Sequence, residues 1–175
     1  MADDYIFRRA KSQDLLGIAT AHVRSWQSAY KGLLPDELLD GLSIERRAEM
    51  WERALASPHI DLFVASAKNE EIVGFVCAGP TRDEDASPHR AEISAIYALP
   101  AVWGQKVGYR LMQAGLDGLR KRTFSQASLW VLEENERGIN FYERFGFVRD
   151  AAPKGFKLDQ LGTAVVREWR YLIDL

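Results

Sequence analysis

One stretch constrains the fold of this 175-residue chain more than any other, because its pattern is that of two strands joined by a helix. An apolar strand is predicted from Ala91 to Ala98, an amphipathic helix from Val107 to about Arg122, and a continuous apolar strand over 128–132. A crossover of this kind makes the two strands parallel and places the start of the helix at the carboxyl end of the first strand. The stretch therefore predicts an α/β fold.

The rest of the chain adds strands and helices on both sides of this unit. Period-two patterns predict strands at 5–9, 147–150 and 164–173 and a hairpin at 61–79, and helical spacing predicts helices at about 12–30, 43–56 and 135–145. The resulting order, β-α-α-β-β-β-α-β-α-β-β, predicts helices packed on a mixed central sheet. The length suits a single domain over 1–175.

Composition excludes several classes of protein. The net charge is −2, which argues against a general nucleic-acid binder. The chain has one cysteine, Cys77, and three histidines without a metal-binding spacing, so neither a disulfide nor a metal site is expected. A signal-peptide pattern is absent, and no apolar run approaches the length of a membrane span. A cytoplasmic protein without membrane contact is the expectation.

Two glycines and a lysine lie between the strand at 91–98 and the helix that follows it. Gly104 and Gly108 allow the backbone to curl and approach a ligand closely, and Lys106 adds positive charge. The first N–H groups of a helix lack internal partners and carry partial positive charge, so an anion such as a pyrophosphate fits there. The spacing matches neither common nucleotide-binding motif, and a tight turn without a ligand is the alternative.

Asn135 and Tyr142 follow the next strand and are seven residues apart. This separation is two helical turns, so both side chains project from one face of the predicted helix, next to the glycine-containing turn. One interpretation is an amide that binds a cofactor and a phenol that donates a proton. The other is a helix-capping asparagine and a core tyrosine.

These segments together resemble the GNAT superfamily of acyl-CoA-dependent N-acetyltransferases. The matching motifs are I-Y-A-L-P at 96–100, W-G-Q-K-V-G at 103–108, N-E-R-G-I-N-F-Y-E-R-F-G-F at 135–147 and W-Q-S-A-Y-K-G-L-L-P at 26–35. Trp103 stands where the family prefers Arg or Gln, and Lys106 stands where it prefers Gly. The resemblance implies a GNAT-like fold, in which the parallel strands splay apart and acetyl-CoA lies between them.

The resemblance also implies which residues hold acetyl-CoA. The pantetheine arm would pair with the backbone of Ile96, Tyr97 and Ala98 and contact Asn135. The pyrophosphate would lie on the N–H groups of Trp103, Gly104, Gln105, Lys106, Val107 and Gly108. Arg137 and Arg144 could reach the adenosine phosphates, or they could form an ordinary solvated face.

The implied reaction is direct attack of a neutral primary amine on a thioester, which needs a base and benefits from an acid at the leaving thiolate. The family match makes Tyr142 the acid. Glu92 is the predicted base, on the strand face that period-two alternation assigns to Ser94, Ile96 and Ala98. Its alternative role is a salt bridge, and His89 is a second candidate base. Cys77 is interpreted as a small buried thiol.

The acceptor is the least constrained partner. The family places it against the first two helices, where Trp26, Tyr30 and Leu33 could line a cleft. The acidic segment 83–85 could attract a cationic amine, although such segments are usually only solvated. A small-molecule or peptide amine is expected, and an acyl-CoA-binding sensor without turnover is the alternative. Dimers are common in the family, and the alternating segment at 164–173 could serve as an edge of a homodimer.

Overall fold

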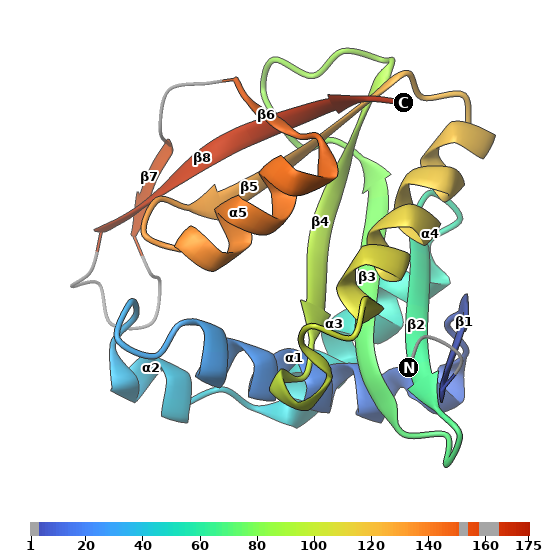
Figure 1. The fold of residues 1–175 in the computed structure, drawn as a ribbon, viewed down its shortest axis with the longest axis vertical. Coiled ribbons are helices and arrows are strands. Elements are labelled where there is room, and N and C mark those ends of the chain that lie inside the picture. The colour runs from blue at the N-terminus through green and yellow to red at the C-terminus, as the bar shows by residue number, and fades with distance from the viewer. Residues whose placement is uncertain (1–3, 151–153, 158–164) are drawn as a thin grey trace.

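The computed structural model describes residues 4–150, 154–157 and 165–175. Within these ranges eight strands form one mixed sheet in the order β1-β2-β3-β4-β5-β8-β6, with β7 paired to β8 (Figure 1). The strands are β1 (Tyr5–Arg9), β2 (Asp61–Ala67), β3 (Ile72–Pro80), β4 (Arg90–Ala98), β5 (Gln126–Leu132), β6 (Val148–Arg149), β7 (Lys154–Lys157) and β8 (Val165–Asp174). The helices are α1 (Leu15–Ala29), α2 (Asp36–Asp40), α3 (Ile44–Ala56), α4 (Val107–Lys121) and α5 (Glu136–Phe145).

Helices cover both faces of the sheet, which confirms the predicted α/β arrangement (Figure 1). α1 and α3 bury Ile18, Ala19 and Trp51 against β2 and β3 on one face. On the other face, α4 presents an apolar stripe to β2–β4, and α5 packs beside it over β5 and β8. Gly115 lets α4 approach the sheet closely, because an added Cβ there would lie 3.1 Å from Val76 Cγ2.

The crossover β4–α4–β5 forms as predicted, and its strands are parallel for only three residue pairs. These pairs run from Arg90↔Gln126 to Glu92↔Ser128. Beyond Glu92 the strands separate, while β4 stays paired with β3 and β5 stays paired with β8. This is the predicted splayed parallel pair, and it leaves one edge of β4 open.

A β-bulge in β4 changes which side chains share a face. The register with β3 passes from Cys77↔Ala95 to Ala78↔Ile93, so Ser94 is the extra residue. As a result Ile96 and Ala98 pack on the α4 side of the sheet, whereas Ala95 and Tyr97 pack on the α1 side. The prediction that Glu92 shares a strict period-two face with Ile96 and Ala98 was wrong, because a bulge reverses the alternation after it.

Three elements differ from the prediction. The short helix α2 follows Pro35 in a segment without long apolar periodicity, and β7 is an unpredicted four-residue strand. The predicted strand at 147–150 is reduced to two residues, and the start of the one at 164–173 falls outside the described residues. Local pattern finds long elements best, so α2 and β7 were missed and the length of β6 was overestimated.

Candidate functional site

A cavity of about 640 Å³ lies between the open edge of β4, the start of α4 and α5; it is called the cofactor cavity below. Its walls include ten of the eleven residues predicted for the cofactor: Ile96, Tyr97, Ala98, Trp103, Gly104, Lys106, Val107, Gly108, Asn135 and Tyr142. Gln105 is the exception. Its side chain accepts a hydrogen bond from Tyr5 and donates one to the Ala101 carbonyl, so it is turned toward β1.

The loop before α4 has the backbone shape that an anion site needs. Gly104 has φ of +78° and Lys106, the N-cap of α4, has φ of +64°. A lysine in this left-handed region costs about 1 kcal/mol relative to glycine. The N–H groups of Trp103 and Gln105 are already bonded to loop carbonyls. The candidate N–H groups for an anion are therefore those at the start of α4, fewer than the sequence predicts.

The open edge of β4 presents alternate backbone groups. Leu99 N–H donates to the Val73 carbonyl, and an antiparallel ladder alternates, so Tyr97 is the next residue whose backbone faces β3. The backbone groups of Ile96 and Ala98 then face the cofactor cavity. Tyr97, predicted to offer its backbone, instead contributes its side chain.

Trp103 occupies part of that edge. Its indole N–H donates to the Ala98 carbonyl over 2.8 Å, and the guanidinium carbon of Arg137 lies 3.3 Å from the centre of the indole ring. Burial lowers the pKa of Arg137. The cation predicted for a phosphate thus stacks on the residue that departs from the family pattern, while Arg144 also lines the cavity.

Asn135 and Tyr142 both line the cofactor cavity from α5. Asn135 is the N-cap of the helix, and its Oδ1 accepts a hydrogen bond from Gly138 N–H over 3.0 Å. The capping interpretation is confirmed, and it leaves the Nδ2 hydrogens outside that bond. Burial, reinforced by the nearby Tyr97, raises the pKa of Tyr142, so its phenol keeps its proton at neutral pH.

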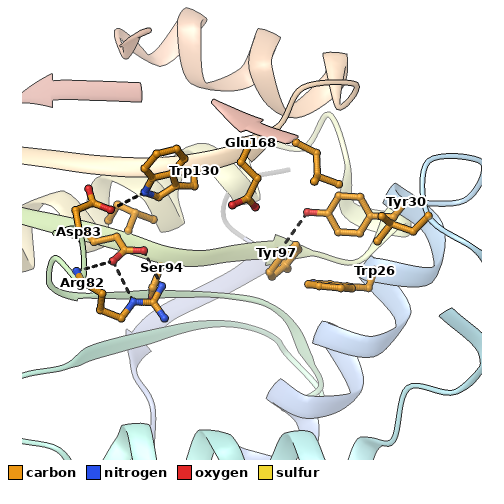
Figure 2. A pocket seen from close by; sticks show the side chains of 12 residues that line it. Trp26, Tyr30, Arg82, Asp83, Ser94, Tyr97, Trp130 and Glu168 are labelled. Atoms are coloured by element: carbon orange, nitrogen blue, oxygen red, sulfur yellow. Dashed lines mark hydrogen bonds and ion pairs between the residues drawn. The ribbon is translucent and has the colours of Figure 1, made fainter. Parts of the chain in front are cut away.

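A second cavity, of about 480 Å³, adjoins the first and is called the acceptor cavity below. Trp26 and Tyr30 line it from α1 and its C-terminal end, as predicted (Figure 2). Leu33 does not line it; this side chain packs against the cluster of Tyr30, Leu34, Leu39 and Leu132, and the neighbouring Leu34 lines the cavity in its place. The turn after α1 determines which of the two leucines faces the acceptor cavity, and the spacing of apolar residues in the sequence does not predict it.

Glu92 also lines the acceptor cavity and is almost fully buried. Its two carboxylate oxygens accept three hydrogen bonds from Arg82, of 2.7, 3.1 and 3.2 Å. The salt bridge weighed against a base role is therefore present. His89 is exposed and lines neither cavity. Cys77 is buried, which raises its thiol pKa and supports the interpretation of an inert thiol.

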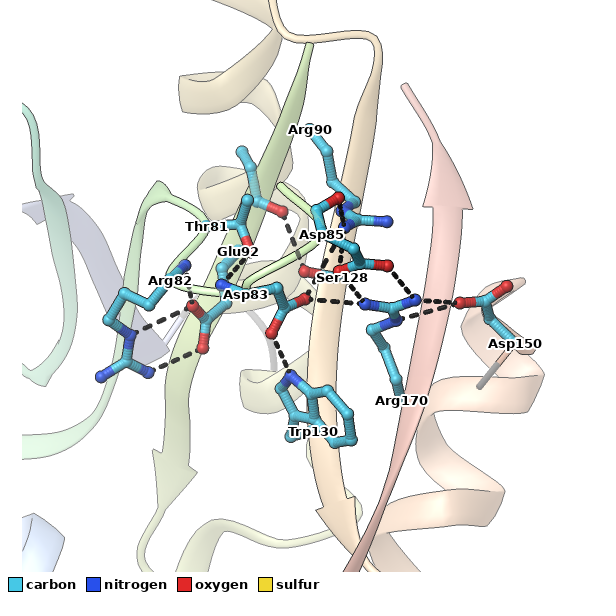
Figure 3. Close-up of polar contacts among 11 residues, drawn as sticks. Thr81, Arg82, Asp83, Asp85, Arg90, Glu92, Ser128, Trp130, Asp150 and Arg170 are labelled. Atoms are coloured by element: carbon cyan, nitrogen blue, oxygen red, sulfur yellow. Dashed lines mark hydrogen bonds and ion pairs between the residues drawn. The ribbon is translucent and has the colours of Figure 1, made fainter. Parts of the chain in front are cut away.

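The acidic segment 83–85 is largely neutralised by arginines (Figure 3). Asp83 accepts hydrogen bonds from the Trp130 indole over 2.9 Å and from Arg170 over 3.2 Å. Asp85 pairs with Arg170 and Arg90, and the hydrogen bond from Arg170 lowers the pKa of Asp85 to about 2. These ion pairs weaken the prediction that the segment attracts a cationic amine.

Sequence reasoning missed several residues of the acceptor cavity, chiefly Glu168 and Trp130 and the side chain of Tyr97. Within the described ranges, no group of three His, Cys, Asp or Glu side chains could hold a metal ion. None of the helices described has the length and apolarity that a bilayer crossing needs.

Comparison with known proteins agrees with this arrangement. The family model "Acetyltransferase (GNAT) family" matches residues 17–147. The uncharacterized N-acetyltransferase YuaI of Bacillus subtilis is 31% identical over 160 residues, 89% of each chain. The spermidine N(1)-acetyltransferase of Thermoplasma acidophilum is 22% identical over 87% of this chain and 94% of its own.

Solved structures show the same fold. The PaiA N-acetyltransferase of Thermoplasma acidophilum, in complex with coenzyme A, superposes with a TM-score of 0.76 at 18% identity and covers 98% of this chain and 99% of its own. This likeness shows that the order of strands and helices in the present chain is that of a known fold. The chain belongs to the acetyltransferase (GNAT) family.

Proposed function

We propose that residues 1–175 act as one N-acetyltransferase domain, which transfers the acetyl group of acetyl-CoA to a primary amine of a small molecule or peptide by direct attack. One observation carries the proposal: Tyr30 and Tyr97 line both the cofactor cavity and the acceptor cavity. Ligands in the two cavities would meet at these side chains, so no covalent enzyme intermediate is needed. The spermidine acetyltransferase among the relatives is named for an amine of this kind.

The described residues fit acetyl-CoA. The strand edge at Ile96 and Ala98 has no neighbouring strand, although the Trp103 indole already bonds the Ala98 carbonyl, and the start of α4 offers N–H groups beside Lys106. Gly108 faces the space between α4 and α5: an added Cβ would make ordinary contact with the Phe141 ring at 3.6 Å, and a longer side chain would enter that space. Arg144 and Arg137 add positive charge along the same cavity.

When bound, acetyl-CoA supplies the thioester whose C–S bond breaks as the amine nitrogen forms the new C–N bond. Tyr142 is proposed to give its phenolic proton to the departing sulfur and to recover a proton from the acylated nitrogen. Because burial raises the pKa of Tyr142, its phenol is protonated at neutral pH and can donate that proton.

Glu92 is proposed as the base that takes the first proton from the acceptor ammonium, directly or through water. The three hydrogen bonds from Arg82 compete with this role, so proton uptake must loosen that ion pair. If Glu92 is the base, Glu92→Gln should abolish the alkaline-rising limb of the pH–rate profile assigned to this carboxyl. An unaltered profile would transfer the role to water or another group.

The test of function is titration calorimetry with acetyl-CoA, followed by a screen of primary amines that detects released CoA thiol. Binding with steady turnover supports the proposal. Binding without turnover on any amine supports the alternative, an acyl-CoA sensor, for which the bond from Trp103 to the Ala98 carbonyl is the favouring observation. Absence of acetyl-CoA binding would refute both. The cytoplasmic location and the homodimer stay predictions.

A further inference from the structure

Two phenol hydroxyls stand where the cofactor and acceptor cavities adjoin. Tyr30 comes from the end of α1 and Tyr97 from β4, and their hydroxyl oxygens are 3.3 Å apart (Figure 2). Both side chains line both cavities. The Tyr97 ring is held by stacking on His22, at 5.1 Å between ring centres. The pair is therefore fixed by packing at the point where the two ligands would meet.

A carboxylate lies near this pair on the opposite wall. Glu168 projects from β8 into the acceptor cavity, between Trp130 and Tyr30 in the view of Figure 2. Its charge acts on the hydroxyls: after burial itself, the negative charge of Glu168 is among the causes that raise the pKa of both Tyr30 and Tyr97. Arg82 and Asp83 lie toward the other end of the cavity in Figure 2, and each is ion-paired, Arg82 with Glu92 and Asp83 with Arg170.

The remaining walls are mostly apolar or aromatic. They are formed by Trp26, Trp130, Leu34, Leu132 and Ile93. A protonated amine would gain from the carboxylate and from the π-faces of the rings, while an apolar body would be buried against the leucines. An acceptor that carried its own carboxylate beside the nitrogen would place that charge against Glu168.

From this arrangement we propose that Glu168 and the Tyr30–Tyr97 hydroxyl pair form the subsite for the acceptor nitrogen. Glu168 selects a cationic primary amine on an apolar or aromatic body, and the hydroxyls hold its nitrogen at the junction of the cavities. This inference rests on the proposed function, because it assigns the site of the acceptor amine. It concerns amine binding, however, and can be tested without turnover.

The test measures binding of 2-phenylethylamine and of its neutral isostere 2-phenylethanol to the full chain at pH 7 by calorimetry. The wild-type protein is expected to bind the amine at least about tenfold more tightly than the alcohol, as one charged hydrogen-bond partner warrants. Glu168→Gln, which keeps the shape, should remove about tenfold of amine affinity and leave alcohol affinity unchanged. Glu71→Gln, in the exposed β2–β3 turn, is the matched control.

The tyrosine hydroxyls are tested in the same assay. Tyr97→Phe and Tyr30→Phe keep the rings and should each weaken amine binding about fivefold, whereas Tyr171→Phe, whose buried hydroxyl bonds Glu143 on α5, should not. Because the two hydroxyls share one nitrogen, the double variant should lose less than the sum of the single losses.

Three results would overturn the inference: no measurable amine binding, equal affinity for amine and alcohol, or an amine preference that survives Glu168→Gln. Turnover is scored separately with acetyl-CoA. Amine binding that depends on Glu168 without acetylation of any amine would refute the proposed function and leave the subsite standing. Acetylation of an amine at an unchanged rate in Glu168→Gln would support the proposed function and refute the subsite.

Discussion

The buried histidine behind the acceptor cavity gives a sharp prediction of pH-dependent stability. His22 lies in the core between α1 and α3, where its Nδ1 accepts a hydrogen bond from the Trp51 indole over 3.1 Å. Burial, aided by the positive charge of Arg47, lowers the pKa of His22 to about 3. In the unfolded chain the histidine pKa is about 6.5. Between about pH 3 and pH 6.5, His22 is therefore protonated in the unfolded chain and neutral in the folded chain.

The sign and size follow from linkage. Since the unfolded state binds more protons below pH 6.5, the free energy of unfolding falls as pH falls through that window. Between pH 7 and pH 5, His22 alone should remove about 2 kcal/mol. The measurement is urea unfolding at pH 7, 6 and 5. The His22→Gln variant offers an oxygen to Trp51 and does not titrate, so its loss over this range should be smaller than the wild-type loss by that amount.

His59→Gln is the control for exchanging a histidine for glutamine, because His59 is exposed. If the curves of wild type and His22→Gln run parallel from pH 7 to pH 5, the reasoning is refuted. Either His22 would then be protonated in the folded protein, or the pocket around it would open more easily than its packing indicates.

Three further substitutions test the sites. Gly108→Leu should weaken acetyl-CoA binding at least about tenfold in calorimetry, because its side chain would enter the space beside Phe141; near-UV circular dichroism should stay unchanged, and unchanged affinity would remove the proposed role of the glycine. Tyr142→Phe should lower kcat by about 10²–10⁴-fold and leave acetyl-CoA affinity within about twofold, and a full-rate variant would exclude it as the acid. Arg170→Gln should lower the free energy of unfolding by about 2–3 kcal/mol, because Asp83 would keep a buried charge without its guanidinium; a loss below about 0.5 kcal/mol would show that Arg90 can replace it.

The long elements and the turn at 103–108 could be predicted because their signals are local, whereas most residues of the cofactor cavity were expected from the resemblance to the family. The apolar stripe of α4, the αL glycine at 146 that ends α5 and the continuous run of β5 each lie within one segment. The turn at 103–108 was recognised because strand, glycines and helix are adjacent in the sequence. What failed inside that turn is the prediction that the N–H groups of Trp103 and Gln105 bind the pyrophosphate. They donate instead to the Pro100 and Val102 carbonyls, a turn geometry that the glycine spacing does not specify.

The acceptor cavity was harder to predict because its walls come from segments far apart in the chain. A bulge at Ser94 shifts the faces of β4, and period-two reasoning has no means of counting an extra residue. Glu168 did leave a signal. It alternates with Arg170 along β8, so two charged residues share one face opposite the apolar face of Trp169 and Tyr171. Two charged residues on one face of a strand could have indicated that this face lines a cavity, here the acceptor cavity.

The short parallel pairing of β4 and β5 has a consequence for motions of the molecule. With three residue pairs joining the halves of the sheet, the amides of Ile96 and Ala98 have solvent where a neighbouring strand would otherwise protect them. Hydrogen–deuterium exchange at these positions should be fast in the free protein and slow once a ligand lies along the edge. If acetyl-CoA lies along this edge as proposed, it would take the place of a neighbouring strand, and these amides would exchange quickly again once it leaves.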